Sequence, residues 1–406
     1  MKTILWIGLT STPEIFEQLA KKGYFHAPTY VAQRNIIEGI ESVSGEIVNS
    51  INGFMMPTYP NGSEIITKGM AWSHIFGAED ISVTSVNLPY IDFAVRQTLM
   101  IKEGRKWARR HINDEKIVLI VYAASQPYIK TALEIKKIIP HAEINLIVPD
   151  LPLYMELNGS PIKQKIKTLM WKGLHELILQ CDRYILFTKH MAKYLSLKEG
   201  SWMVMEGTVN VTDIQVSDIS IQENEKIIIM YSGAIGMKYG VPELLQAFMQ
   251  IKERNYELWF TGKGNADELV ANACKEDDRI KAYGFLPSRQ DVLKLQQKAT
   301  MLINTRMPTE KASAYCFPSK IFEYLLSGKP TLSFKIPGIP DEYYDYLISM
   351  DNVSSEAIKE AILRVGAMSS EQRRKVGEKG REFVLREKNN QIQAKRICDF
   401  IGIETR

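Results

Sequence analysis

Short runs of β-branched residues alternate with longer helical patterns along the whole sequence. These runs predict strands at Ile4–Gly8, Ile117–Tyr122, Ile144–Val148, Tyr184–Phe187, Lys226–Tyr231, Glu257–Thr261, Thr300–Asn304 and Thr331–Phe334. Strands that alternate with helices are typical of βαβ units, in which a helix connects two parallel strands of one sheet. The sequence therefore predicts an α/β fold built on parallel sheets.

The length of the chain favours two such sheets over one. A single hydrophobic core stops growing at about 250–300 residues, and the chain has 406. Segment 206–225 is polar and has no apolar stripe, so we place the link between two domains there. We expect a doubly wound Rossmann-like domain over residues 1–205 and another over 206–385. A C-terminal helix in residues 386–406 is expected to pack back toward the first domain.

Composition and charge exclude several classes of protein. With 45% hydrophobic and 24% charged residues, the chain has the composition of an ordinary globular protein. A net charge of +4 without a dense basic helix argues against nucleic acid as a partner. The four cysteines lack metal-ligand spacing, which predicts reduced thiols. The apolar run at the start is short and polar residues follow it, so we expect a first strand, not a signal peptide, and a cytoplasmic protein.

Two basic stretches leave contact with a membrane surface open. One is Arg105–His111, and the other carries Lys163, Lys165, Lys167 and Lys172 beside Leu169, Met170 and Trp171. Cationic, partly apolar surfaces of this kind can rest on anionic lipid. The alternative is an ordinary solvated helix face. The solvated face is the favoured interpretation, and peripheral contact at the inner face of the plasma membrane stays open beside it.

The segment Phe317–Pro330 carries the most specific chemical signal. Pro318 suits the start of a helix, and Gly328 with Pro330 suits its end. The polar residues of this otherwise apolar helix share one narrow sector, namely Ser319, Lys320, Glu323 and Ser327. The helix N-terminus and Lys320 can hold a diphosphate, while Glu323 can accept hydrogen bonds from two ribose hydroxyls. The alternative is an ordinary helix with a Lys320–Glu323 surface ion pair.

Glycine turns follow the predicted strands of the second half. They carry Gly233 and Gly236 with Lys238, then Gly262 and Gly264, and then Tyr283-Gly-Phe285. Glycine lets backbone amides approach an anion, and Lys238 can supply the opposite charge. Ligands of open α/β sheets bind at the carboxyl ends of the strands. The sequence therefore predicts a phosphate-binding pocket in the second domain.

Together these segments resemble the donor domain of the retaining glycosyltransferases of family 4. The resemblance implies the GT-B fold, two Rossmann-like domains that face a central cleft. It implies that Glu323 binds the donor ribose and that Gly233 and Lys238 bind the phosphates. Residues 334–344 are further similar to the bacterial branch that builds capsular and extracellular polysaccharides. Arg306 matches a basic position of that branch near the donor.

The chain departs from the family pattern at two positions. Tyr315 stands where the first Glu of the E-x7-E motif is expected. We expect the loop around Tyr315 to reach the sugar through its backbone. After the strand Ile144–Val148, where many members have His-Asp, the chain has Pro149-Asp150. Asp150 is therefore the polar candidate that remains at this place, and we expect it to have a catalytic role.

The first half offers candidates for acceptor binding. Gly8 and Thr10 follow the first strand, and His26 and Arg34 lie in an aromatic and basic stretch that we interpret as a loop. The alternative for His26 is a structural role.

The predicted reaction is transfer of a hexose-type sugar from a UDP- or GDP-sugar to a glycan or lipid-linked acceptor, with the retention that the resemblance implies. Lys238, Lys320 and Arg306 would stabilise the departing diphosphate, without an obligatory metal or other cofactor. The alternatives are another GT-B enzyme, such as an epimerase or a phosphorylase, and a non-catalytic partner subunit that keeps the fold.

Overall fold

A computed structural model describes residues 2–21, 27–62, 64–89, 91–153, 161–210, 226–286, 289–350 and 352–406. The chain divides into two compact units. Unit 1 comprises residues 1–208 and 390–406, and unit 2 comprises residues 209–389. The sequence predicts the two borders after residues 205 and 385, a few residues earlier in each case.

Unit 1 is built on an eight-stranded sheet with the order β10-β9-β8-β7-β1-β2-β5-β4. Neighbouring strands are parallel except β4 and β5, which are antiparallel. The bounds are β1 (Lys2–Gly8), β2 (Val48–Asn52), β4 (Met70–Trp72), β5 (Asp80–Ser82), β7 (Lys116–Tyr122), β8 (Glu143–Val148), β9 (Arg183–Leu186) and β10 (Trp202–Val204). A separate antiparallel pair joins β3 (Ile66–Thr67) to β6 (Ser85–Val86).

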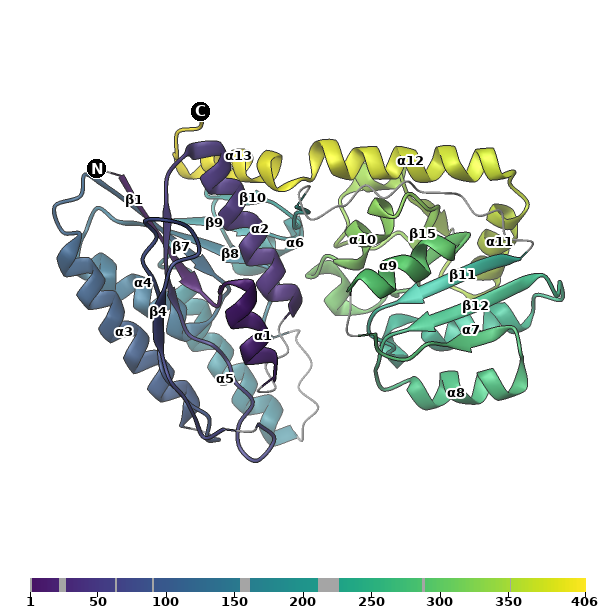
Figure 1. Ribbon diagram of the computed structural model, residues 1–406, viewed down its shortest axis with the longest axis horizontal. Helices are drawn as coiled ribbons and strands as arrows, with labels where there is room; N and C mark the ends of the chain where they lie inside the picture. The colour runs from purple at the N-terminus through teal and green to yellow at the C-terminus, as the bar shows by residue number, and fades with distance from the viewer. Residues whose placement is uncertain are drawn as a thin grey trace. The chain divides into compact units, whose positions relative to one another are not determined.

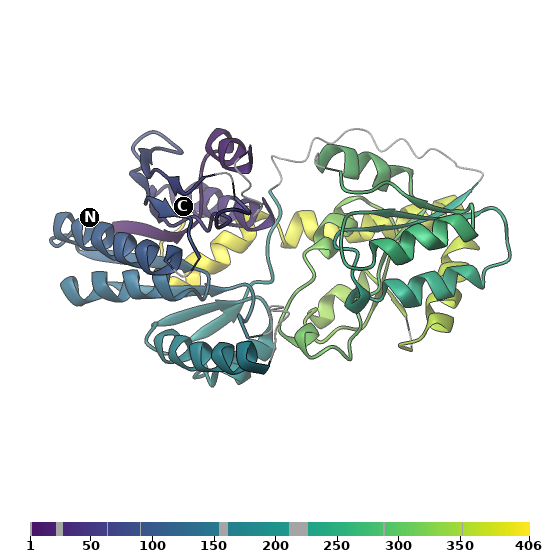
Figure 2. The ribbon, with the colours of Figure 1, turned by 90° about the horizontal axis from the view of Figure 1, so that it is seen from below.

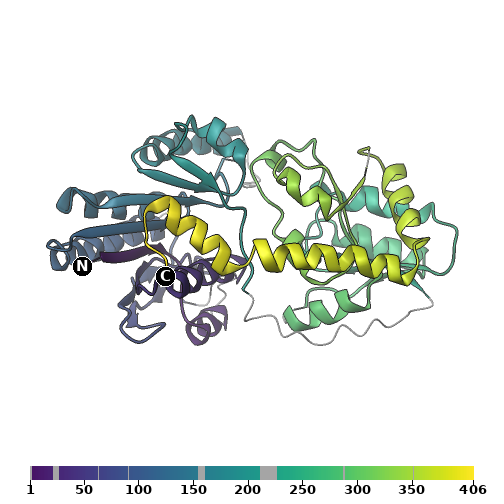
Figure 3. The same ribbon diagram turned by 90° about the horizontal axis from the view of Figure 1, so that it is seen from above.

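Helices cover the sheet of unit 1. They are α1 (Pro13–Lys21), α2 (Ala27–Ser44), α3 (Asp92–Arg110), α4 (Gln126–Ile138), α5 (Pro161–Ile178), α6 (Lys189–Leu195) and α13 (Asn390–Ile401). Figure 2 shows α3 and α4 side by side. The last helix, α13, lies beside α2 (Figure 3), where Ile397 and Ile401 join Ile36, Ile37 and Ile40 in one buried cluster. Burial of this apolar face attaches the end of the chain to unit 1.

Unit 2 is built on a six-stranded parallel sheet with the order β13-β12-β11-β14-β15-β16. The bounds are β11 (Ile227–Ser232), β12 (Tyr256–Thr261), β13 (Ile280–Ala282), β14 (Met301–Asn304), β15 (Thr331–Phe334) and β16 (Ile348–Met350). Figure 1 shows α7 and α8 on one side of β11 and β12, and α10 and α12 on the other. Because both faces are covered, the central strands are almost entirely buried and apolar.

The helices of unit 2 are α7 (Val241–Met249), α8 (Asp267–Glu276), α9 (Arg289–Lys298), α10 (Lys320–Leu326), α11 (Ser355–Gly366) and α12 (Ser370–Glu387). Short 3₁₀ turns occur at η2 (Met237–Tyr239), η3 (Lys311–Ala314) and η4 (Asp341–Asp345). The two doubly wound sheets confirm the predicted α/β fold class. Within the described ranges, no helix is both long and apolar enough to cross a membrane.

Candidate functional site

The carboxyl ends of β11 and β14 form the centre of the candidate donor site. In unit 2 the strand order runs outward in both directions from this pair, since β12 and β13 lie beyond β11, and β15 and β16 lie beyond β14. Ligands of open α/β sheets bind where the strand order reverses in this way. Gly233 directly follows β11, and Arg306 comes two residues after β14. The sequence-predicted candidates therefore converge on the switch point of the sheet.

Close backbone packing explains the glycines of the two loops. Gly233 and Gly262 both have positive φ, +118° and +137°. A Cβ atom on Gly262 would lie 1.8 Å from the Gly233 carbonyl oxygen, and one on Gly264 would lie 2.0 Å from the Ile235 carbonyl oxygen. A side chain at either position is excluded by the facing backbone. The loop after β12 thereby supports the loop after β11 and leaves Gly233 exposed.

Lys320, the first residue of α10, extends to Gly233. Its Nζ lies 3.9 Å from the centroid of the Tyr231 ring. A Cβ atom on Gly233 would lie 3.8 Å from the same Nζ, so the ammonium group is adjacent to the exposed glycine. Burial and, to a smaller extent, the positive charge of Arg306 lower the pKa of Lys320, the charge of Glu323 opposes both, and the resulting pKa is about 7. A bound anion would therefore favour the protonated, positively charged form of Lys320.

Glu323, which lies on α10 three residues after Lys320, takes a different partner. The Nε2 atom of Gln296 on α9 donates to Glu323 Oε1 and, over 3.0 Å, to Ser232 Oγ. The hydroxyl of Tyr324 accepts from the Ser232 backbone N–H and donates to the Ser232 carbonyl, both over 2.9 Å. The Glu323 carboxylate is thus held at the end of β11, and a simple Lys320–Glu323 surface pair is not the observed arrangement.

Sequence reasoning missed Gln296. The apolar stripe of α9 carries the partly buried Val292 and Leu295 and continues to the buried Ala299 just after the helix, and the buried Gln296 lies on the same stripe at the i+4 position from Val292. A polar residue at an apolar position of a helix is the signal that could have identified it.

Arg306 connects three segments around the site. Its Nε donates to Ser313 Oγ over 3.2 Å, and its guanidinium carbon lies 5.8 Å from the Tyr239 ring centroid. The neighbouring Thr305 hydroxyl donates to the Tyr239 carbonyl over 2.7 Å. A Cβ atom on Gly240 would lie 2.0 Å from the Thr305 carbonyl oxygen. The turn that carries Lys238 is therefore fixed against the loop after β14.

The other predicted donor residues lie around this centre. Lys238 and Ser319 are exposed, Gly236 packs on the Tyr239 ring, and the Tyr315 backbone N–H donates to the Ala312 carbonyl over 3.1 Å. Phe285 follows β13, a strand at the edge of the sheet, and its side chain is 67% exposed. The structure places Phe285 two strands away from β11 in the sheet order.

In unit 1 the candidates Gly8 and Thr10 lie at the corresponding switch point, between β1 and β7. A Cβ atom on Gly8 would lie 2.4 Å from Gln33 Oε1, and the Thr10 backbone N–H donates to Asn52 Oδ1 over 2.8 Å. Asp150 comes two residues after β8; burial raises the pKa of Tyr122, at the end of β7, and the charge of Asp150 raises it further. Asn52 has no counterpart among the sequence-based candidates.

The predicted loop around Arg34 is wrong, because residues 27–44 form α2. The polar residues Gln33 and Arg34, for which the sequence predicts a loop, lie within this helix. Arg34 pairs with Glu38 one turn along, with 3.0 Å between Nε and Oε1, and its guanidinium carbon lies 6.0 Å from the Tyr30 ring centroid. His26 lies outside the described residues.

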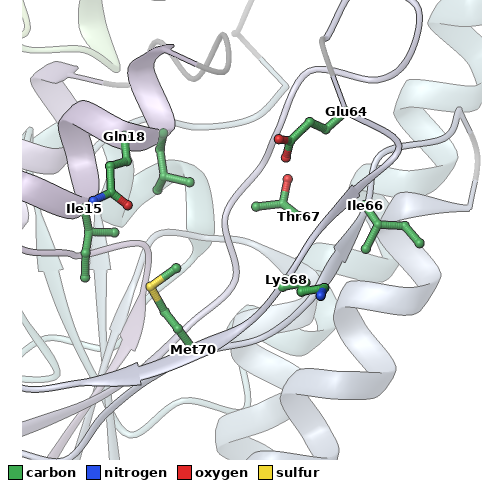
Figure 4. A pocket seen from close by; sticks show the side chains of 8 residues that line it. Ile15, Gln18, Glu64, Ile66, Thr67, Lys68 and Met70 are labelled. Atoms are coloured by element: carbon green, nitrogen blue, oxygen red, sulfur yellow. The ribbon is translucent and has the colours of Figure 1, made fainter.

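A pocket that the sequence did not predict lies between α1 and residues 64–70 of unit 1 (Figure 4). Its volume is about 280 Å³. Its lining is half apolar and comprises Ile15, Leu19, Ile66 and Met70 with Gln18, Glu64, Thr67 and Lys68. Helix α1 lines one side of the pocket and begins directly after residues 8–12, which include the predicted acceptor residues Gly8 and Thr10.

Acidic partners reduce the charge of the first basic stretch. Arg105 pairs with Glu134 over 2.5 Å, Lys106 with Glu103 over 2.8 Å, and Arg110 with Glu79 over 2.7 Å. In the second stretch Leu169 and Met170 are exposed, whereas the side chains of residues 163, 165 and 167 lie outside the described residues. Exposed ion pairs weaken the attraction of this surface to anionic lipid. Peripheral membrane contact stays a prediction.

Comparison with known proteins agrees with this geometry. Residues 226–367 match the family described as Glycosyl transferases group 1, and they lie within unit 2. Most of the second unit is therefore similar to the group 1 glycosyltransferases. A comparison with curated protein sequences found no match.

Solved structures resemble the whole chain. The lipopolysaccharide outer core galactosyltransferase WaaB superposes with a TM-score of 0.64 at 14% identity, over 99% of each chain. Sucrose-phosphate synthase from Thermosynechococcus elongatus gives 0.66 at 15% over 98% of each chain. Anabaena HepE in complex with UDP and glucose gives 0.63 at 11%, over 99% of this chain and 100% of the other. At these identities the likeness establishes the GT-B fold.

Proposed function

We propose that the protein transfers a hexose-type sugar from a UDP- or GDP-sugar to a glycan or lipid-linked acceptor, with retention of configuration. The family match of residues 226–367 supports the glycosyltransferase class. The observation that carries the proposal is the placement of Lys320 Nζ against the exposed Gly233, with the Glu323 carboxylate held beside the same strand end. A cation at a glycine turn and a carboxylate nearby match a nucleoside diphosphate, since the phosphates require positive charge and the ribose offers hydroxyl donors.

The charges of the site suit departure of the diphosphate. When the bond between the anomeric carbon and the phosphate oxygen breaks, negative charge increases on that oxygen. Lys320 and Arg306 both lie at this strand end, and the charge of Arg306 contributes, after burial, to the lowered pKa of Lys320. Cations that are fixed before the reaction stabilise such charge without reorganisation. We assign this role to both residues and to Lys238, and we assign phosphate contact to the backbone at Gly233, Gly236, Gly262 and Gly264.

The proposal extends to the sugar, the base and the acceptor. We assign the donor sugar to Tyr315 and Ser319 and the base side to Phe285. We assign a catalytic role to Asp150 and acceptor binding to Gly8, Thr10, His26 and Arg34. The Anabaena HepE structure holds UDP and glucose, which supports a UDP-sugar as the first donor to test. We further propose a role in bacterial capsular or other surface polysaccharide synthesis, in the cytoplasm or at the inner face of the plasma membrane.

Incubation of the full chain with a panel of UDP- and GDP-sugars tests the proposal. We expect one nucleotide sugar to raise the melting temperature and to be hydrolysed slowly, because water replaces the missing acceptor. The Lys320→Met variant should lose hydrolysis. Absence of both stabilisation and hydrolysis across the panel would refute the proposal. Binding without hydrolysis, or without transfer to any offered acceptor, would favour the non-catalytic subunit, for which the Tyr315 departure is the specific reason.

A further inference from the structure

We propose that Gln296 positions the Glu323 carboxylate for the donor ribose and so makes the site selective for ribonucleotides. The inference rests on the proposed function, because it assumes a nucleoside diphosphate at Gly233 and Lys320. It adds a positioning residue that does not itself contact the donor.

The two hydrogens of the Gln296 amide are both used. Gln296 is 0% exposed, and its Nε2 atom donates to Ser232 Oγ over 3.0 Å and to Glu323 Oε1. An amide nitrogen has two N–H donors, so the side chain bridges the end of β11 and the carboxylate on α10. Glu323 itself is partly exposed, so part of its side chain is accessible to a ligand.

Stability alone does not explain this glutamine. Its Oε1 atom is buried and finds no hydrogen-bond partner in the part of the chain that the structure describes. A buried acceptor without a partner costs free energy, and an apolar side chain of the same shape avoids that cost. A residue selected for packing at this position would be apolar. The donor group therefore has a role beyond filling the core.

The end of β11 keeps its position without Gln296. Tyr324 binds both the backbone N–H and the carbonyl of Ser232. Loss of the Gln296 amide should therefore leave the strand end in place and release one oxygen of Glu323. A carboxylate that is free to rotate has to be ordered when the ribose binds, which lowers affinity. The expected defect is confined to ligands that carry ribose hydroxyls.

The experiment compares two ligands on the full chain by calorimetric titration, namely UDP and 2′,3′-dideoxy-UDP, or the guanosine pair if GDP binds better. For the wild type we expect UDP to bind roughly ten- to a hundred-fold more tightly, because hydrogen bonds to a charged acceptor are lost in the dideoxy ligand. In Gln296→Met most of this preference should disappear through weaker UDP binding, while the dideoxy affinity stays within about two-fold. The control Gln297→Met changes the exposed neighbour and should leave both affinities unchanged.

The outcomes separate positioning from damage. Equal weakening of both ligands would show a general structural effect and overturn the inference, as would unchanged UDP affinity. In a Glu323→Gln background, Gln296→Met should cause no further loss, and a full additional loss would also overturn it. If Gln296→Met does not fold, Gln296→Leu takes its place in the same comparison. Wild-type chain that binds neither UDP nor GDP would instead refute the proposed function, and the inference with it.

Discussion

Lys320 should take up a proton when a nucleotide sugar binds. Its pKa of about 7 in the free protein arises from burial next to Arg306, so a large fraction of the side chain is neutral above neutral pH. A diphosphate beside the ammonium group favours the charged form and raises the pKa again. Binding and protonation are therefore coupled.

The size of the effect follows from the pKa of the free protein. With a pKa of about 7, about 0.1 of the molecules carry a neutral amine at pH 6, about 0.5 at pH 7 and about 0.9 at pH 8. If the bound form is fully protonated, these fractions are the protons taken up per ligand. The same coupling weakens apparent affinity roughly ten-fold between pH 6 and pH 8. Affinity is highest where the free side chain is already charged.

Calorimetric titration in buffers with different ionisation enthalpies measures the uptake, since the observed heat changes in proportion to the protons exchanged with the buffer. A UDP-sugar is the suitable ligand, because each of its phosphates has one ester and one anhydride bond and so has no group that titrates near neutral pH. The terminal phosphate of UDP titrates near pH 6 and would obscure the result. Lys320→Arg keeps a positive charge at every pH tested and should bind with no uptake.

Two results would refute this reasoning. Wild-type protein that binds at pH 8 without uptake would show that the Lys320 ammonium group does not face the diphosphate. Uptake that persists in Lys320→Arg would assign the proton to another group.

Three further predictions test the rest of the site. Glu323→Gln should lower UDP affinity roughly ten- to a hundred-fold, because charge-assisted hydrogen bonds contribute about 1.5–3 kcal/mol, and unchanged affinity in calorimetry would assign Glu323 a structural role. Gly262→Ala should reduce the free energy of unfolding by more than about 2 kcal/mol in urea titration, because its Cβ would lie 1.8 Å from the Gly233 carbonyl oxygen at a φ of +137°. The control is Gly173→Ala on α5, where a Cβ meets nothing within 4 Å, and this change should stabilise the protein slightly. Donor hydrolysis should survive EDTA because Lys320, Arg306 and Lys238 carry the positive charge, and complete loss that magnesium or manganese restores would contradict this assignment.

Long apolar strands could be predicted from the sequence because burial on both faces requires an uninterrupted apolar run. β7 (Lys116–Tyr122) and β11 (Ile227–Ser232) are of this kind, and both appear at the predicted places. Strands β2 and β5 could not be found in this way. Ser50, Asn52 and Asp80 occupy buried positions in them and hydrogen-bond to one another, with Ser50 Oγ donating to Asp80 Oδ1 over 2.5 Å. The polar side chains of these strands find hydrogen-bond partners within the sheet, and the local sequence does not show which residues these partners are.

The glycines of the donor site could be predicted for a different reason. Gly233 and Gly262 are required by the local backbone, because both have a positive φ. At Gly262 the nearby Gly233 carbonyl oxygen also excludes a side chain. Such a requirement appears directly in the sequence as a glycine after a strand. The residues that contact each other across the site cannot be recognised in the sequence in this way. Gln296 and Ser232 are 64 residues apart, and their contact depends on how α9 packs against the sheet.

A combined pattern would still have identified Gln296. The stripe of α9 predicts burial at the i, i+3, i+4 and i+7 positions from Val292, and the i+4 position holds a glutamine. A buried amide requires hydrogen-bond partners, and in a parallel α/β domain the polar groups available near a sheet face are concentrated at the strand ends. The glycine turn after β11 and the polar sector of α10 mark one such end. A polar residue in an apolar helix stripe, in the same domain as these signals, therefore predicts a contact at the ligand site.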